Sequence, residues 1–108
     1  MGNQTVAVIT PAFRAQDTIA ATVRSILMQT HADFEHHIIS DDGVDYGKFL
    51  ADNGLSDPRL RFHSSGKVGG GSTRARNMVL DLLDTPYAAL LDADDRFKPR
   101  KLELAVAA

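Results

Sequence analysis

The stretch from Tyr87 to Asp95 constrains this chain most, because a short apolar run there ends in three carboxylates. The run follows Pro86 and has the length and composition of a strand buried on both faces of a parallel sheet. Open α/β sheets bind ligands at the carboxyl ends of such strands. Asp92, Asp94 and Asp95 would repel one another there, and a hard divalent cation with oxygen ligands would relieve the repulsion. An acidic turn that stays in water accounts for the same residues.

The composition limits the classes of protein to consider. With 108 residues and a hydrophobic fraction of 44%, the chain suits one folded domain. The formal net charge of −2 gives no electrostatic reason to expect binding to nucleic acid or to an anionic membrane. The chain has no cysteine, which suits a reducing compartment. Residues 1–5 lack the pattern of a signal peptide or a membrane-spanning helix.

Strand and helix patterns alternate along the chain. Apolar runs at 6–9 and 87–91 and the segment His36–Ile39 predict strands, and alternating charged and apolar residues at 59–63 predict a strand nearer a sheet edge. Apolar residues at helical spacing predict helices that begin near residues 18, 46, 72 and 99, the third capped by Ser72. Alternating strands and helices are typical of a mainly parallel sheet with right-handed crossovers. We therefore expect an α/β fold, built as a three-layer α/β/α sandwich.

Four polar segments would meet at one edge of such a sheet, because the carboxyl ends of parallel strands lie together. A nucleotide suits their chemistry: an aromatic ring stacks on a base, a carboxylate accepts from a base N–H, and glycines let backbone amides approach phosphate. A guanidinium grips phosphate oxygens, and acidic residues hold a bridging cation. The segments are Thr10–Phe13, Asp41 with Asp42, the glycine run 66–71 with Arg74 and Arg76 behind it, and Asp92–Asp95.

Each piece also has a simpler interpretation. Taken alone, Phe13 fits a packing residue and Asp42 with Gly43 fits a turn. Arg74 and Arg76 fit a solvated helix turn. The adjacent histidines at 36 and 37 point to opposite faces of a strand, so we interpret them as structural, and we interpret His31 and His63, which stand alone in the sequence, in the same way. The glycine fingerprint of dinucleotide-binding folds and the P-loop ending are both absent.

Taken together, the motifs resemble family 2 glycosyltransferases of the GT-A type. The resemblance extends over nearly the whole chain, in order and with sensible spacing. Two departures stand out: Phe13 occupies a position where many relatives carry tyrosine, and Val44–Asp45 replaces a segment that often contains serine or threonine. The motifs that carry the resemblance are Val8–Phe13, Ser25–Thr30, Ser40–Gly43, Gly71–Asn77 and Leu91–Asp95.

The resemblance implies a site for a nucleoside-diphosphate sugar, most readily a UDP-sugar, with Mn²⁺ or Mg²⁺. It implies that Asp94, with Asp92, binds the metal, that Asp92 also contacts ribose or sugar, and that Asp95 supports them. Arg76 would lie near the phosphates, and Asp41 or Asp42 would hold the base. The full set of implied donor-site residues is Thr10, Pro11, Ala12, Phe13, Asp41, Asp42, Gly71, Arg76, Asp92 and Ala93.

The resemblance also implies that this chain is shorter than the family's complete domain. Residues 1–108 would form the donor-binding half of a truncated GT-A domain, without the half that binds a saccharide or other hydroxyl acceptor and supplies the catalytic base. No catalytic residue is assigned, and a cytoplasmic location, including the cytoplasmic face of a membrane, is expected. Two alternatives stay open: a nucleotidyltransferase, and a non-catalytic nucleotide-binding or assembly module that self-associates through an open sheet edge.

Overall fold

The computed structural model describes residues 3–107. Met1, Gly2 and Ala108 lie outside the described part, and the first two belong to the segment 1–5 that lacks a signal-peptide pattern. Within that part, no helix combines the length and the apolar character needed to cross a bilayer. Four strands alternate with four helices: β1 (Val6–Ala12), α1 (Ile19–Leu27), β2 (Phe34–Ser40), α2 (Tyr46–Asp52), β3 (Leu60–Ser64), α3 (Ser72–Leu80), β4 (Tyr87–Leu90) and α4 (Lys101–Ala107).

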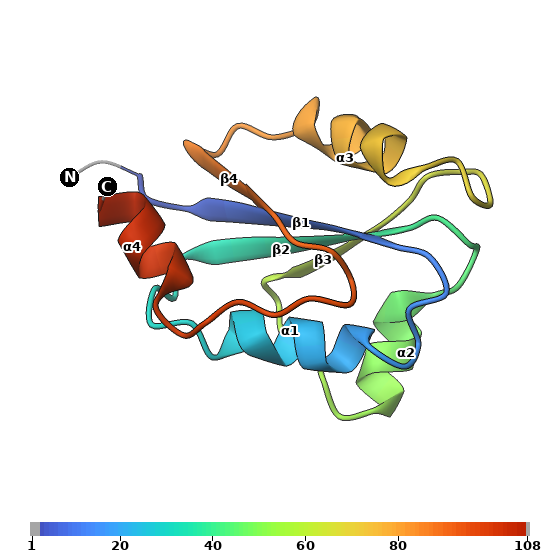
Figure 1. Ribbon diagram of the computed structural model, residues 1–108, viewed down its shortest axis with the longest axis horizontal. Coiled ribbons are helices and arrows are strands. Elements are labelled where there is room, and N and C mark those ends of the chain that lie inside the picture. Colours follow the sequence, from blue (N-terminus) through green and yellow to red (C-terminus); the bar gives the residue numbers. More distant parts are fainter. Residues whose placement is uncertain (1–2, 108) are drawn as a thin grey trace.

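The strands form one parallel sheet in the order β3-β2-β1-β4. In Figure 1, α3 covers one face of this sheet, and α1, α2 and α4 lie on the other. The predicted α/β/α sandwich with a parallel sheet is confirmed. Because every strand runs in the same direction, the segments that leave the strands collect at one edge of the sheet.

The two central strands explain why the sequence shows apolar runs rather than alternation. Helices cover both of their faces, so consecutive residues are buried in turn. Val8 and Ile38 pack on the side of α1, whereas Ile9 and Ile39 pack under α3 against Ala75 and other small or branched side chains. Fully burying one such large aliphatic side chain stabilises the fold by roughly 1.5–3 kcal/mol.

The fourth strand lies in a different environment from the one predicted. The apolar run at 87–91 was expected to be buried on both faces, but β4 is an edge strand that pairs only with β1 among the described residues. Tyr87 is 36% exposed and Leu90 52% exposed, whereas Leu91 just beyond the strand is buried. An apolar run reports a preference for burial, but whether a further strand lies alongside depends on the rest of the fold.

The histidines divide between the two faces of the sheet. His36 is buried on the α1 side, with its Nε2 2.8 Å from the Thr10 hydroxyl. His37 points to the opposite face, as predicted, and His63, which stands alone in the sequence, contacts it there. His37 Nδ1 lies 2.8 Å from His63 Nε2, and the two rings stack. The parallel register pairs Ile39 with His63, which brings His63 diagonally next to His37 on the same face.

Burial of His36 should make the protein less stable as the pH falls. Burial, helped by the nearby His37, lowers the pKa of His36 to about 3. Unfolding therefore takes up a proton below the usual histidine pKa, and the free energy of unfolding decreases from about pH 6.5 downward. His36→Gln should reduce this slope by roughly 1 kcal/mol per pH unit, measured by urea unfolding between pH 6 and 5.

A volume change in the core without a titratable group provides the control. Ile38→Val should lower stability by roughly 0.5–1.5 kcal/mol at every pH and leave the slope unchanged. An unaltered slope in His36→Gln would contradict a neutral buried imidazole.

Candidate active site

A cavity of about 480 Å³ opens at the carboxyl edge of the sheet. Its walls come from the segment that follows β1, from the first residue of α3 and from the acidic segment after β4. Two of the four predicted segments therefore line the cavity, and Ser72, which directly follows the glycine run, lines it as well. The lining residues are Pro11, Phe13, Arg14, Ala15, Thr18, Ser72, Asp92, Ala93 and Asp94.

The aromatic ring of Phe13 is available at this cavity. It is 43% exposed, which excludes the simpler interpretation of Phe13 as a core residue. The glycine run lies beside it, since a Cβ added at Gly69 would come 3.8 Å from the ring. The guanidinium of Arg14 lies over the ring, 5.0 Å from its centre. An exposed aromatic ring such as that of Phe13, with backbone close by, can stack on another flat ring.

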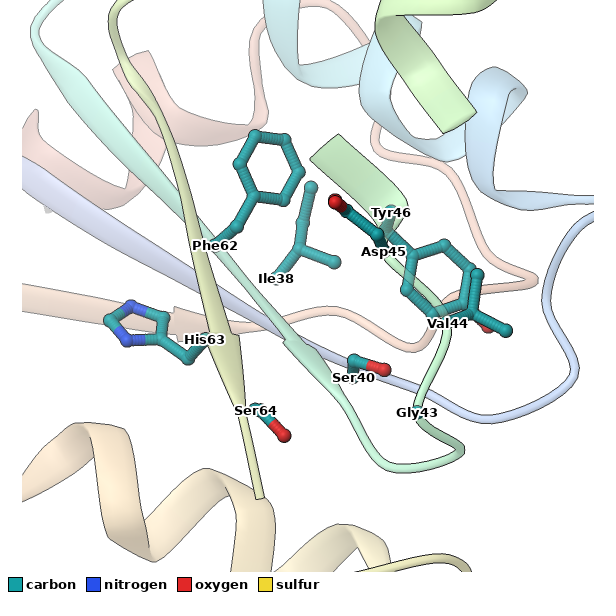
Figure 2. A pocket seen from close by; sticks show the side chains of 9 residues that line it. All are labelled: Ile38, Ser40, Gly43, Val44, Asp45, Tyr46, Phe62, His63 and Ser64. Atoms are coloured by element: carbon teal, nitrogen blue, oxygen red, sulfur yellow. The ribbon is translucent and has the colours of Figure 1, made fainter. Parts of the chain in front are cut away.

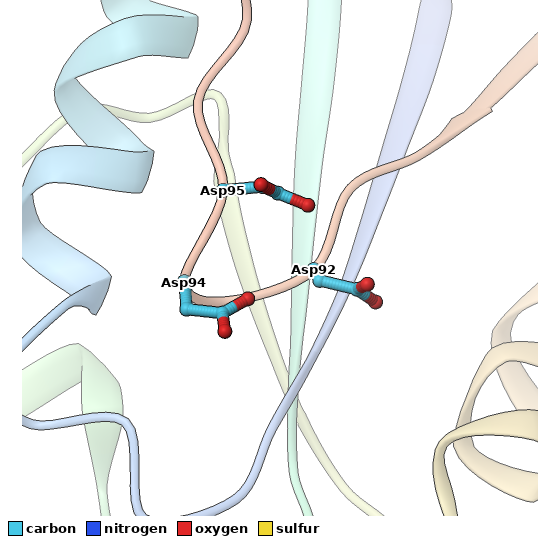
Figure 3. A group of neighbouring side chains, drawn as sticks. All are labelled: Asp92, Asp94 and Asp95. Carbon is cyan, nitrogen blue, oxygen red and sulfur yellow. The ribbon is translucent and has the colours of Figure 1, made fainter.

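The acidic segment brings three exposed carboxylates together. Figure 3 shows Asp94 and Asp95 extending from the loop toward Asp92, and one carboxylate oxygen of each lies within 4.8 Å of the others. This oxygen-only donor set suits a hard divalent cation such as Mn²⁺ or Mg²⁺. Arg76 Nη2 donates to Asp92 Oδ1 over 2.7 Å, which leaves the second oxygen of Asp92 for another partner. Asp95, expected only as a support, is as well placed as the other two.

Helix α1 holds this acidic segment in place. The buried Thr22 hydroxyl lies 2.9 Å from the Ala93 carbonyl and 2.6 Å from the Asp95 carbonyl, and it can donate to either. One turn further, Ser25 Oγ accepts from the Phe97 N–H. Gln29 then donates to the Lys98 carbonyl and accepts from the Leu102 N–H. The sequence analysis missed these residues, although polar side chains on the apolar face of a helix were a visible signal.

Asp41 holds the glycine run rather than facing the cavity. It is only 3% exposed, and its carboxylate accepts from the Ser65 hydroxyl and from the N–H groups of Gly70 and Gly71. The Ser65 hydrogen bond, supported by the glycine N–H groups, keeps the pKa of Asp41 below its ordinary value despite burial. Gly71, with φ of 99°, and not Ser72, caps α3, because the turn needs a left-handed backbone that glycine adopts without strain.

Asp42 holds the turn that follows β1. Its carboxylate accepts from the Arg14 N–H at 2.6 Å and from the Tyr46 hydroxyl at 2.7 Å. Burial opposes ionisation of Asp42, but these hydrogen bonds outweigh it and the pKa stays below its ordinary value. Burial, with the Asp42 carboxylate, raises the pKa of Tyr46 to about 12. Asp41 and Asp42 thus use most of their hydrogen-bonding capacity to shape two loops.

The remaining predicted residues lie behind the cavity. Thr10 and Ala12 are fully buried, the former bonded to His36 and the latter accepting the Asp41 N–H through its carbonyl. Arg74 donates to the Ser65 carbonyl and so supports the glycine run. The predicted residues that line the cavity itself are Pro11, Phe13, Asp92, Ala93 and Asp94.

Another cavity, of about 350 Å³, lies between the ends of β2 and β3 and the start of α2. Figure 2 shows the rings of Phe62 and Tyr46 on its walls, with the His63 side chain pointing the other way. It contains none of the predicted donor-site residues and no cluster of carboxylates, so we place the candidate site in the cavity beside Phe13.

Comparison with known proteins decides the family. The model of "Glycosyl transferase family 2" matches residues 7–108. The chain belongs to this family. It is 32% identical, over 106 residues, to an Escherichia coli protein named UDP-Glc:alpha-D-GlcNAc-diphosphoundecaprenol beta-1,3-glucosyltransferase WfgD. That match covers 98% of this chain but only 41% of the relative, so the chain spans less than half of the relative's length.

Solved structures show the same fold. Staphylococcus aureus TarS 1-349 in complex with UDP-GlcNAc superposes with a TM-score of 0.82 and 21% identity, covering 95% of this chain and 30% of that one. The mannosyltransferase PcManGT from Pyrobaculum calidifontis, in complex with GDP-Man and Mn²⁺, gives a TM-score of 0.75 and 20% identity over 94% of this chain and 30% of that one. The predicted GT-A fold of this family 2 chain is confirmed.

Removing the Thr22 hydroxyl should loosen the acidic segment. Thr22→Val keeps the shape but leaves buried carbonyls without a donor, which should cost about 1–3 kcal/mol of stability. Hydrogen exchange followed by mass spectrometry should show faster exchange across residues 92–97. Thr22→Ser, which retains the hydroxyl, should keep this segment protected. Equal exchange in the two variants would show that the hydroxyl does not hold the loop.

Proposed function

We propose that this chain is the donor-binding part of a glycosyltransferase that transfers a sugar from a nucleoside diphosphate to a hydroxyl acceptor. The observation that carries the proposal is the cavity where the Phe13 ring, the start of α3 and a cluster of three carboxylates meet. An aromatic ring suits a base, and a helix N-terminus with carboxylates suits a metal diphosphate. Family membership supports the same reaction class.

The base would stack on Phe13, with Pro11 beside it. Asp41 and Asp42 would define the base pocket by fixing the glycine run and the turn at Arg14. Asp41 accepts three hydrogen bonds and keeps a lone pair that could accept from a base N–H, whereas Asp42 already accepts four. Thr10 and Ala12 would support the base pocket from its buried side. Gly71 would let the backbone approach the phosphates next to α3.

Asp92, Asp94 and Asp95 would hold Mn²⁺ or Mg²⁺ near the diphosphate, and Asp92 and Ala93 would lie next to the ribose or sugar. When bound, the metal supplies positive charge that offsets the charge on a departing diphosphate. Arg76 would orient Asp92 through their ion pair and add positive charge beside the phosphates. A catalytic base is not assigned among these residues, and we expect acceptor-site residues outside this chain.

The donor is most readily a UDP-sugar. The WfgD name describes transfer of glucose from UDP-Glc to a diphosphoundecaprenol-linked sugar, and the TarS complex contains UDP-GlcNAc. The PcManGT complex contains GDP-Man with Mn²⁺, which supports metal use in this fold. By analogy we propose a saccharide acceptor, or another hydroxyl compound, and action in the cytoplasm at the face of a membrane.

Metal-dependent binding of UDP is the first expected result. Isothermal titration calorimetry should show UDP binding with Mn²⁺ and much weaker binding without it. Asp94→Ala should weaken binding by at least about tenfold, equivalent to about 1.4 kcal/mol, because a carboxylate ligand is lost. Asp52→Ala, which removes a carboxylate paired only with the exposed Lys48, should leave binding unchanged.

Other outcomes of this titration distinguish a different donor from the absence of a donor site. Binding of GDP or dTDP in place of UDP would keep the reaction class and change the donor. If the folded chain binds no nucleoside diphosphate, the donor-site proposal fails and the family relationship is one of ancestry only.

The exposed edge of β4 favours a second candidate, an assembly module. Tyr87, Ala88 and Leu90 are exposed on a strand that pairs on one side only among the described residues. Such an edge offers unpaired backbone groups to another chain. We propose self-association through this edge, in addition to donor binding or instead of it.

Light scattering tests self-association directly. The chain should form dimers or larger species as concentration rises, and Leu90→Lys should shift it toward monomer because charge on an edge strand opposes pairing. Leu82→Lys, the same change at an exposed position outside the strand, should have little effect. A monomer at every concentration would reject this candidate.

A further inference from the structure

The segment that follows the acidic cluster carries a dense set of positive charges. Arg96, Lys98, Arg100 and Lys101 are all exposed. Two hollows flank this segment and share residues 96–99 as a common wall. Helix α1 contributes a further exposed cation to one hollow, the residue after its end contributes an exposed thioether, and α4 contributes an exposed leucine to the other hollow. We call these residues the basic surface: Arg24, Met28, Arg96–Lys101 and Leu104.

The basic surface also exposes apolar side chains. Met28 is 70% exposed and Leu104 is 55% exposed. Between them, Phe97 and Pro99 line both hollows, one of which has a volume of about 690 Å³. The Lys101 ammonium lies 5.8 Å from the centre of the Phe97 ring. The two hollows thus combine cations with apolar side chains instead of forming a purely polar patch.

Few acidic groups oppose these charges. Glu103 pairs with Arg100 over 2.6 Å, in an exposed ion pair that contributes little. Asp95 lines a neighbouring cavity with Arg96. In the described part of the chain, neither hollow is lined by an aspartate or a glutamate. The formal net charge of −2 conceals this surface because it averages over the whole chain.

We propose that the basic surface docks onto an anionic lipid bilayer. Lysine and arginine are attracted to anionic headgroups, and exposed apolar side chains enter the interface between headgroups and acyl chains. A nucleic-acid backbone would use the cations but would give Met28 and Leu104 no partner. The inference names a surface for the membrane location proposed above, and it does not depend on nucleotide binding.

Docking here would fix the orientation of the donor cavity relative to the membrane. The basic surface begins at Arg96, directly after Asp95 of the acidic cluster. The same hydrogen bonds from Ser25 and Gln29 that fix the backbone at Phe97 and Lys98 make the surface continuous with α1.

Vesicle co-sedimentation of the full chain tests this inference. The chain should sediment with vesicles that mix phosphatidylcholine and phosphatidylglycerol, and not with phosphatidylcholine alone. Lys98→Glu with Lys101→Glu should weaken binding by at least about tenfold, since each basic residue near an anionic surface contributes roughly fivefold. Met28→Ser with Leu104→Ser should also weaken it, most clearly at salt concentrations that screen charge.

A matched pair of substitutions controls for net charge. Lys48→Glu with Arg61→Glu changes the total charge equally at exposed positions away from the basic surface and should retain binding. Circular dichroism should show that all variants are folded. Absence of wild-type binding to anionic vesicles, or equal loss in the two charge pairs, would overturn the proposal. If the Met28 and Leu104 variant binds vesicles as tightly as the wild type, or if the wild type binds duplex DNA equally tightly, the bilayer proposal is wrong. The surface would then bind a polyanion through charge alone.

Discussion

The hydrogen bonds from α1 to the backbone after β4 are the interactions on which the candidate site most depends. Beyond Leu91 the chain leaves the sheet, so its N–H and C=O groups lose the partners that a strand provides. Thr22, Ser25 and Gln29 supply replacements at the positions where this irregular backbone crosses the helix. Buried backbone groups without such partners would be costly. The helix therefore serves the site through its polar stripe as much as through its apolar face.

The acidic residues at the sheet edge divide into two kinds, and this division determines what the site can bind. Asp41 and Asp42 are largely buried, and both oxygens of each already accept hydrogen bonds that stabilise the ionised form. Asp94 and Asp95 are exposed beside Asp92 and can be shared with a cation. One pair thus organises loops, and the other cluster remains available for a ligand. The same residue type performs both tasks because the surrounding N–H groups differ.

The sequence predicted the parallel sheet and its helices well because those features follow from local spacing. Runs such as Val6–Ile9 must be buried on both faces, and only helices on either side of a sheet accomplish that. The meeting of Pro11, Phe13 and Asp94 followed from strand direction alone. Features that depend on register or on distant partners were not predictable: the stacking of His63 on His37, the edge position of β4 and the internal use of Asp41. The Thr22 contacts belong to this second group, since they join residues more than 70 positions apart.

The segment between Asp92 and Leu102 has two sides with opposite charge. Its first residues present carboxylates to the cavity, and the following ones present cations together with apolar side chains. Because Thr22, Ser25 and Gln29 bond to both parts, a movement of one part relative to the other would leave backbone groups unsatisfied. A partner bound to the cationic side would therefore orient the acidic side rather than switch it. The geometry of the segment thus depends on the positions of Thr22 and Ser25 in α1 and of Gln29 just beyond the end of this helix.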